Sequence, residues 1–247
     1  MATIQEREIL ATKIIPVIWA SHARLPKADL TAFLSMTGHL YKGDLMVIGR
    51  ALNGWLEHGF LPADLNDSKN ADTFVDEVYK SVTEGYRMEW VSEHWGAATK
   101  YNTRRSAFWR VIRTLISSLQ IADVNSPEWP SYLVWSNLYK VAPKNEGNPN
   151  STLRNLQLPG CLDLFRLELI TYKPKRLLFL TGMDWASPFL NAVNAQIRKN
   201  ASFRYVEGFG QISITEEIVV QFAVASHPQG KPESPWIKEV TTVFESS

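Results

Sequence analysis

The stretch from Leu158 to Gly182, LPGCLDLFRLELITYKPKRLLFLTG, decides the fold class that we predict for this chain. Apolar residues recur at helical spacing in its first part and predict a helix over Leu158–Tyr172, with Pro159 in the first turn. Pro174 ends that helix. The continuous apolar run Arg176–Thr181 then predicts a buried strand. A helix followed closely by a strand that is buried on both faces is typical of α/β proteins.

The rest of the chain repeats this alternation of helices and strands. Three further apolar runs predict core strands at Asp44–Gly49, Tyr132–Leu138 and Ile218–Ser226, and two shorter runs predict edge strands at Phe203–Val206 and Gln211–Ile214. Helical spacing and capping residues predict the helices Ile4–Ala20 (kinked at Pro16), Lys27–Thr37, Ala71–Val82, Met88–His94, Thr103–Leu119, Asp184–Asn200 and Pro235–Phe244. Strands separated by helices indicate a mostly parallel sheet with helices on both faces.

Size and composition indicate one globular domain. The chain has 247 residues and a formal net charge of +1, so its global charge gives no attraction to nucleic acid. Its one cysteine, Cys161, excludes a disulfide framework or a cysteine metal cage within the chain. No apolar run reaches the roughly 20 residues that span a bilayer. We expect a cytoplasmic monomer without a metal, a cofactor or a membrane partner.

Polar residues directly follow three of the predicted strands. These segments are Gly49-Arg50-Ala51-Leu52-Asn53-Gly54, Asn137-Leu138-Tyr139-Lys140 and Ser226-His227-Pro228-Gln229-Gly230. Open α/β sheets bind their ligands outside the carboxyl ends of the strands. We therefore expect the three segments to converge on one cleft, with two amides and a histidine as its chemistry.

The sequence from Ser136 to Pro149, SNLYKVAPKNEGNP, resembles a segment of the iron–sulfur-type uracil-DNA glycosylases. The helix and strand that follow are similar as well, with a cysteine near the helix start and Lys-Pro before the apolar strand. Ser226-His227-Pro228 matches the His-Pro motif of the uracil-DNA glycosylase superfamily. The resemblance covers roughly residues 44–60 and 131–240 of one domain spanning 1–247. It leaves an N-terminal helical extension (1–40) and a helical insertion (62–130) unmatched.

The resemblance implies a three-layer α/β/α sandwich around a central four-stranded, mostly parallel sheet, which flips a damaged base from DNA and hydrolyses its glycosidic bond. His227 would donate a hydrogen bond to the pyrimidine oxygen on which negative charge develops. Asn53 would orient the attacking water, and Asn137 would read the edge of the base through its amide. The base pocket would also contain Gly49, Arg50 and the stacking ring of Trp55. The residues facing the phosphate backbone would be Lys140, Lys144, Gln229 and Lys231.

The chain departs from the family pattern in three places, one of which is that the His motif continues Gln229-Gly230-Lys231 instead of the usual Ser-Pro or small apolar pair. Cys161 stands alone, so the cysteines that hold an iron–sulfur cluster are missing. Arg50 follows Gly49 directly, and Asn53 comes later than the usual motif residue and has no proline beside it. An arginine at that position would suit an anionic ligand as well as a base. The site residues also have structural interpretations: His227 and Asn53 as turn residues, Asn137 as a brace for its loop and Trp55 as part of the core.

A second nucleic-acid signal lies outside the matched segments. The sequence from Lys100 to Arg113, KYNTRRSAFWRVIR, contains five basic residues and no acidic one, with aromatic residues among them. Basic side chains next to stacking rings are typical of proteins that bind single strands or the phosphate backbone. Arg104 and Arg105 at the predicted helix start are unfavourable beside the helix dipole, which indicates a use for their charge elsewhere. The alternative is an exposed helix face with its aromatic residues in the core.

We therefore predict a DNA glycosylase that removes uracil or another deaminated or damaged base from single-stranded or duplex DNA. One alternative is a module with the same fold that binds nucleic acid or a nucleotide without hydrolysis. Another is a hydrolase of small nucleosides or other anionic ligands, which would have a deep pocket without a basic rim. Excision and binding assays distinguish these hypotheses.

Overall fold

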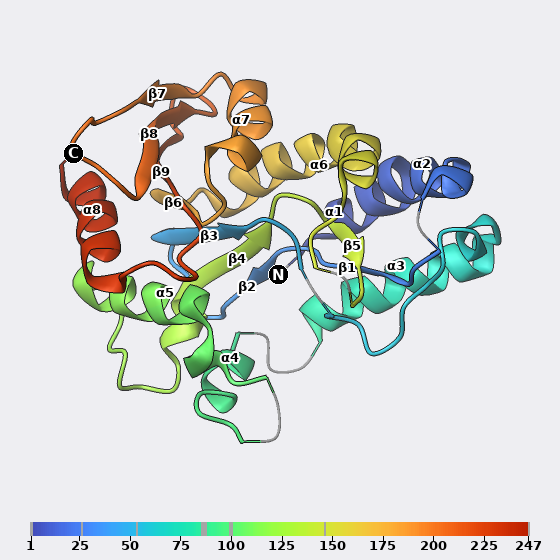
Figure 1. Cartoon of the computed structure of the whole chain (residues 1–247), viewed down its shortest axis with the longest axis horizontal. Helices are drawn as coiled ribbons and strands as arrows, with labels where there is room; N and C mark the ends of the chain where they lie inside the picture. The colour runs from blue at the N-terminus through green and yellow to red at the C-terminus, as the bar shows by residue number, and fades with distance from the viewer. Residues whose placement is uncertain are drawn as a thin grey trace. The chain divides into compact units, whose positions relative to one another are not determined.

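The computed structural model describes residues 2–25, 27–52, 54–84, 88–98, 101–145 and 147–246. The chain divides into two compact units, which we describe separately (Figure 1). The first unit comprises Met1–Met36, Gly49–Gly85 and Ser136–Thr171. The second unit comprises Thr37–Ile48, Tyr86–Trp135 and Tyr172–Ser247. In the part of the chain that the structure describes, no helix is long and apolar enough to cross a membrane.

The main sheet contains seven strands, three more than the four predicted from the family resemblance. Its order is β2-β4-β3-β6-β9-β8-β7. The strands are β2 (Met36–Thr37), β4 (Leu133–Asn137), β3 (Leu45–Gly49), β6 (Arg176–Phe179), β9 (Val219–Ala225), β8 (Val206–Ser213) and β7 (Gln196–Arg198). The pairs β3–β6 and β6–β9 are parallel, whereas β9–β8 and β8–β7 are antiparallel. The predicted α/β class is confirmed, and the four predicted core strands are neighbours in this sheet.

The sheet grows beyond four strands because short segments pair onto both of its edges. In place of the two predicted edge strands Phe203–Val206 and Gln211–Ile214 there is one strand, β8, which leaves Phe203, Arg204, Tyr205 and Ile214 outside it and has a bulge between Val206 and Gly208. β7 pairs along β8 in the register Gln196↔Gln211 and Arg198↔Phe209. Its three residues are exposed, which left no burial pattern by which the sequence could identify a strand.

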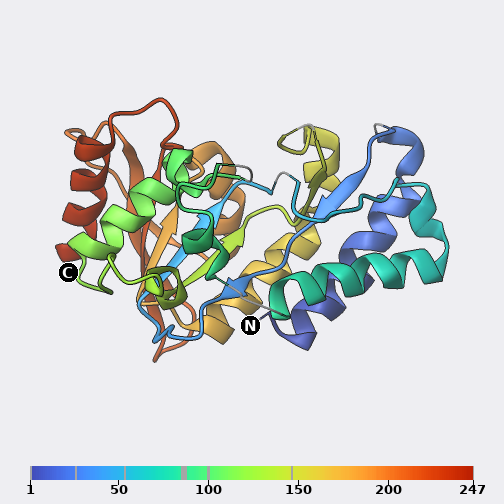
Figure 2. The same ribbon diagram turned by 90° about the horizontal axis from the view of Figure 1, so that it is seen from below.

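The described residues of the second unit contain four helices. They are α4 (Trp90–Glu93), α5 (Ala107–Ser118), α7 (Met183–Ala192) and α8 (Glu233–Glu245), and 3₁₀ turns cover Thr103–Arg105 and Trp129–Tyr132. α5 and α8 lie side by side, and α8 packs on β8 and β9 (Figures 1 and 2). The Trp109 ring packs edge-on against Trp90 and Trp135, with centroids 5.5 and 5.2 Å apart. These aromatic contacts form part of the core of the second unit.

The first unit is mainly helical. Its helices are α1 (Ile4–Ile9), a π-helical turn (Leu10–Ile14), α2 (Ile15–Ala20), α3 (Ser68–Thr83) and α6 (Ser151–Tyr172), with 3₁₀ turns at His22–Arg24 and Asp64–Asn66. α1 packs against α3 (Figure 2). β1 (Leu30–Ala32) pairs antiparallel with β5 (Val141–Pro143) in a separate two-stranded sheet. The π-helical turn immediately precedes Pro16, whose missing N–H and bulky ring disrupt regular helical bonding.

Three helix predictions need correction. The segment Lys27–Thr37 is not a helix, because β1 and β2 use its backbone groups for strand pairing. The helix predicted to reach Asn200 ends at Ala192, and Asn194 has a left-handed φ of 50°, which no helix continues. Pro159 lies inside α6 rather than in its first turn. α6 begins at Ser151, where the Leu153 N–H donates to Asn150 Oδ1 over 2.9 Å.

Close backbone contact explains the glycine at position 38. The Gly38 N–H donates to Leu133 O, and a Cβ at this position would lie 2.2 Å from the carbonyl oxygen of Ser131. We expect Gly38→Ala to lower the free energy of unfolding by about 1–3 kcal/mol or more, because backbone atoms must move. Urea denaturation measures this loss. Gly96→Ala is the control, since its φ of 86° is strained but its surroundings are open. Equal losses in both variants would contradict a steric origin.

Candidate functional site

The first two predicted polar segments lie together in the first unit. The Leu138 N–H donates to Gly49 O over 2.9 Å, and the Tyr139 N–H donates to Arg50 O over 3.0 Å. The ends of β3 and β4 are therefore joined by backbone hydrogen bonds. Asn53, the predicted water-orienting residue, lies outside the residues that the structure describes.

Asn137, the last residue of β4, carries a buried amide. The residue is 3% exposed, and its Nδ2 has no hydrogen-bond partner among the described residues. A buried donor without a partner costs about 1–3 kcal/mol, so such groups are rare in folded proteins. Nδ2 is one of nine buried side-chain atoms without a hydrogen-bond partner among the described residues, and its position at the carboxyl end of a strand, where open α/β sheets bind their ligands, distinguishes it as a candidate. The alternative prediction was that the Asn137 amide braces its own loop. Nδ2 makes no hydrogen bond to that loop among the described residues, so it does not support this alternative.

Trp55 and Lys144 are held by contacts within the first unit. The Trp55 ring packs edge-on against Phe33 with centroids 5.1 Å apart, and its Nε1 donates to Ser81 Oγ over 2.8 Å. These contacts fix the half-buried indole and agree with a role as a wall of the core. Lys144 Nζ donates to Glu57 O, which uses one of the three donors of its ammonium group.

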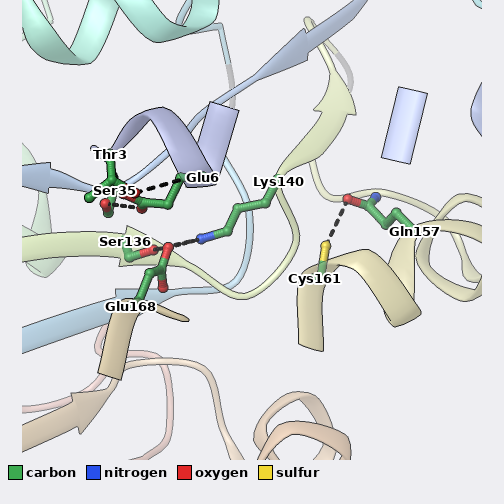
Figure 3. Close-up of polar contacts among 8 residues, drawn as sticks. All are labelled: Thr3, Glu6, Ser35, Ser136, Lys140, Gln157, Cys161 and Glu168. Carbon is green, nitrogen blue, oxygen red and sulfur yellow. Dashed lines mark hydrogen bonds and ion pairs between the residues drawn. The ribbon is translucent and has the colours of Figure 1, made fainter. Parts of the chain in front are cut away.

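Lys140 does not face a phosphate backbone, contrary to the prediction. Its side chain is 1% exposed, and Nζ lies 2.5 Å from Glu168 Oε1 and 2.7 Å from Ser136 Oγ. The Ser136 hydroxyl also donates to Glu168 Oε1 over 2.9 Å (Figure 3). An ammonium that is desolvated and paired in this way cannot reach DNA. Ser136 and Lys140 flank the Asn137 segment, so this ion pair fixes the strand end that carries Asn137.

A second carboxylate lies near the ion pair. Glu6 is fully buried and accepts hydrogen bonds from Thr3 N and Ser35 Oγ, both at 2.5 Å (Figure 3). Burial is the largest cause that raises the pKa of Glu168, the Lys140 ammonium opposes it and the charge of Glu6 adds to it, and together these effects raise the pKa to about 7. Ser136, Lys140 and Glu168 resemble a nucleophile with its base, but each is at most 1% exposed. A substrate has no access to them, so their role is structural.

The raised pKa of Glu168 predicts a pH-dependent stability. Between the ordinary carboxyl pKa of 4.5 and about 7, the folded chain holds a proton that the unfolded chain has released. This contribution to stability is complete below pH 4.5 and is lost as the pH rises through 7. We expect the difference in unfolding free energy between wild type and Glu168→Gln to shrink between pH 5 and 8. Urea titrations at several pH values measure it, and a constant difference would contradict the assignment.

His227 follows β9 in the second unit and is half-buried. The Gln229 N–H lies 3.3 Å from His227 Nδ1. A backbone N–H only donates, so Nδ1 accepts and the neutral imidazole carries its proton on Nε2. This tautomer makes Nε2 a hydrogen-bond donor, as the predicted role of His227 requires.

The backbone before His227 is fixed on both sides by residues that the sequence interpretation missed. The Ser226 N–H donates to Tyr205 O over 2.8 Å, and Trp236 Nε1 donates to Ser226 O over 2.9 Å. The Glu239 carboxylate accepts backbone N–H groups from Arg204, Tyr205 and Val206 at 2.9, 2.7 and 2.9 Å. Trp236 and Glu239 lie on α8, where the sequence pattern distinguished only a buried face from an exposed one.

Arg110 connects two segments of the second unit that carry predicted DNA-binding residues. Its Nε and Nη2 bond to Glu233 Oε1 at 2.8 and 2.6 Å, and its Nη1 donates to Arg104 O over 3.0 Å. The turn that carries Arg104 and Arg105 is thereby linked to the start of α8, directly after the loop that carries His227. We call the exposed side chains of this region the basic surface, and they are Tyr101, Arg104, Arg105, Gln229 and Lys231.

The other basic residues of the Lys100–Arg113 segment do not contribute to this surface. Arg113 lies 5.1 Å above the Trp95 ring and donates to Val124 O, and Arg110 is paired with Glu233. Lys100 lies outside the described residues. Arg104 and Arg105 therefore remain candidates for binding nucleic acid, whereas Arg110 and Arg113 make structural contacts.

Among the described residues, no group of three or more His, Cys, Asp or Glu side chains is placed to hold a metal ion. No protein-family model matches the chain. No curated protein matches its sequence either.

Proposed function

We propose that this protein is a DNA glycosylase that hydrolyses the bond between sugar and base at uracil or another deaminated base. The observation that carries the proposal is the buried Asn137 amide, whose Nδ2 has no partner among the described residues. A flipped pyrimidine offers an oxygen acceptor and a ring N–H donor on its Watson–Crick edge. An asparagine amide complements both groups, because it has one oxygen acceptor and two N–H donors.

His227 supplies the second part of the proposed chemistry. Cleavage of the glycosidic bond leaves negative charge on the oxygens of the departing pyrimidine. A donor aimed at this charge lowers the barrier, as in an oxyanion hole. The hydrogen bond from Gln229 N to His227 Nδ1 favours the proton on Nε2, which supports this role. Asn53 keeps its proposed role of orienting the water. In this proposal the glycosylase core would comprise β4, β3, β6 and β9, which are neighbours in the sheet.

The basic surface supports binding of the DNA strand. Arg104, Arg105 and Lys231 are exposed, and Tyr101, whose ring centroid lies 6.4 Å from that of Trp90, is 58% exposed and offers its open ring surface for stacking. These three cations lie on two segments that Arg110 links through Arg104 O and Glu233, and they provide local positive charge that a net charge of +1 does not. The same surface would serve a module that binds nucleic acid without hydrolysis, and it is the specific observation that favours this second candidate.

A base-excision assay tests the proposal. Labelled single- and double-stranded oligonucleotides with one uracil, hypoxanthine or xanthine are incubated with the protein and then cleaved with alkali. We expect cleavage by the wild type, and a loss of at least tenfold in Asn137→Ala, equivalent to about 1.4 kcal/mol of barrier. Asn191→Ala on the exposed side of α7 is the matched control and should cleave normally. Salt-dependent binding without cleavage of any substrate would replace the glycosylase by the binding module.

A further inference from the structure

The second unit contains a cavity of about 230 Å³ near the beginning of β9, the end opposite to His227. Its walls come from β7, β8, β9, the loop before β8 and the end of α8. The side chains that matter for its chemistry are Arg198, Asn200, Phe203, Phe209, Gln211 and Gln221. The cavity includes none of the residues assigned to excision.

Strand register fixes a cation beside an aromatic pair in this cavity. β7 and β8 place Arg198 opposite Phe209. The Phe209 and Phe203 rings have centroids 6.0 Å apart and are tilted by 56°. Gly210 allows this close strand pairing, because a Cβ there would lie 1.8 Å from Gln196 O. The β7–β8 pair therefore fixes Arg198 and Phe209, and Phe203 comes from the loop between the two strands.

No Asp or Glu is among the lining residues of the cavity, and Arg198 is its one lining side chain with a formal charge. The nearest carboxylate that the contacts show is Glu239, which accepts the backbone N–H groups of Arg204, Tyr205 and Val206 in the loop before β8. Arg198 is exposed and has no ion-pair partner within the described part of the chain. Its guanidinium group is thus available to an anion from outside the protein, and Arg binds phosphate through two parallel hydrogen bonds.

Amide side chains supply the polar groups of the cavity. Gln221 Nε2 donates to Val243 O over 2.6 Å, which fixes this amide between β9 and α8. Its carbonyl oxygen remains as an acceptor, and Gln211 adds an uncharged donor and acceptor. Asn200 Oδ1 accepts from Ser202 N and Ser202 Oγ at 3.0 and 2.8 Å, so this amide offers its N–H groups. Phenylalanine rings next to amides are the groups with which proteins stack a base and read its edge.

We propose that this cavity binds a nucleoside monophosphate unit, with its base against Phe203 and Phe209 and its phosphate on Arg198. The cavity is smaller than the roughly 300–1,000 Å³ of pockets for drug-sized ligands, which favours one nucleotide over a dinucleotide. The unit has two possible sources, a free nucleotide or the phosphorylated end of a strand. This proposal does not rest on base excision.

Calorimetric titration of the full chain tests the proposal. The ligands are uridine and adenosine monophosphate, the matching nucleosides, inorganic phosphate and a 5′-phosphorylated oligothymidine. We expect at least tenfold tighter binding of the nucleotides than of the nucleosides. Arg198→Ala should remove most of that difference, whereas Phe203→Leu should weaken nucleotide and nucleoside alike. Arg24→Ala, an exposed arginine of the first unit, is the matched control.

Each outcome of the titration either assigns the ligand to one source or overturns the proposal. Binding of the mononucleotides assigns the site to a free nucleotide. Binding of the 5′-phosphorylated strand that Arg198→Ala weakens, without binding of the mononucleotides, assigns it to a strand end, because strand binding to the basic surface does not depend on Arg198. Equal affinity for nucleosides and nucleotides, no effect of Arg198→Ala beyond that of Arg24→Ala, or no saturable binding would each overturn the proposal. Circular dichroism of both variants establishes that a lost signal reflects the site and not the fold.

Discussion

Replacing Lys140 by methionine is expected to lower the free energy of unfolding by about 3–5 kcal/mol, because it leaves the Glu168 carboxylate buried without its cation. The two side chains are each 1% exposed, and Nζ lies 2.5 Å from Oε1. At pH 8 the uncompensated Glu168 carboxylate must either stay charged in the core or take up a proton. We therefore expect a smaller loss at pH 5, where this carboxyl is protonated in the wild type.

Two further variants make this prediction specific. Lys13→Met removes an exposed ion pair in which Lys13 Nζ lies 2.6 Å from Asp163 Oδ2. This substitution should lower the free energy of unfolding by less than about 1 kcal/mol. The double variant Lys140→Met/Glu168→Leu removes both buried charges and should recover part of the loss. Urea unfolding followed by circular dichroism measures all three. A loss in Lys140→Met no larger than in Lys13→Met would show that the buried pair does not fix β4.

The second large effect concerns the proposed excision reaction. His227→Ala should lower the single-turnover excision rate by about 100- to 1,000-fold, the usual cost of removing one donor to a developing oxyanion. The reason is that Nδ1 accepts from the Gln229 N–H, so Nε2 carries the proton that the substrate oxygen needs. His227→Gln retains an N–H donor and should lose less activity than His227→Ala.

His22→Ala is the matched control for this experiment. His22 is an exposed histidine of the first unit, with Nδ1 2.8 Å from Trp19 O, and its loss should leave excision unchanged. Filter binding of a labelled oligonucleotide should give similar affinities for wild type and His227→Ala, because the basic surface remains. Full excision activity in His227→Ala would remove His227 from the proposed mechanism.

The alternation of strands and helices was predictable because it depends on local patterns. The continuous apolar runs around Val47, Leu178 and Phe222 predicted β3, β6 and β9 within a few residues. Their parallel pairing follows from the intervening helices. The prediction of a helix at Lys27–Thr37 was wrong. The apolar residues around Leu30 would be buried in a helix or in a strand, and pairing with β5 is what selects the strand.

The candidate site was less predictable, because burial of a polar residue depends on distant partners. The sequence around Lys140, which precedes a strand, does not differ from that around an exposed lysine. Its partner Glu168 lies 28 positions further along the chain. Asn137 was singled out correctly as a strand-end amide, but its missing hydrogen-bond partner is visible only in the folded chain. Trp236 and Glu239 gave no functional signal, since an amphipathic helix explains both.

By itself, the sequence determined the α/β class, the central strands and the polar residues that end them. Apolar periodicity and strand-ending residues act over fewer than ten positions, and the hydrophobic effect enforces them wherever the chain folds. The tertiary structure alone decided that Lys140 is an internal cation, that Arg110 pairs with Glu233 and that Arg198 stands opposite Phe209. The first two depend on ion pairs between residues far apart in sequence, and the third depends on the register of two strands across a loop. No local pattern in the sequence encodes such contacts.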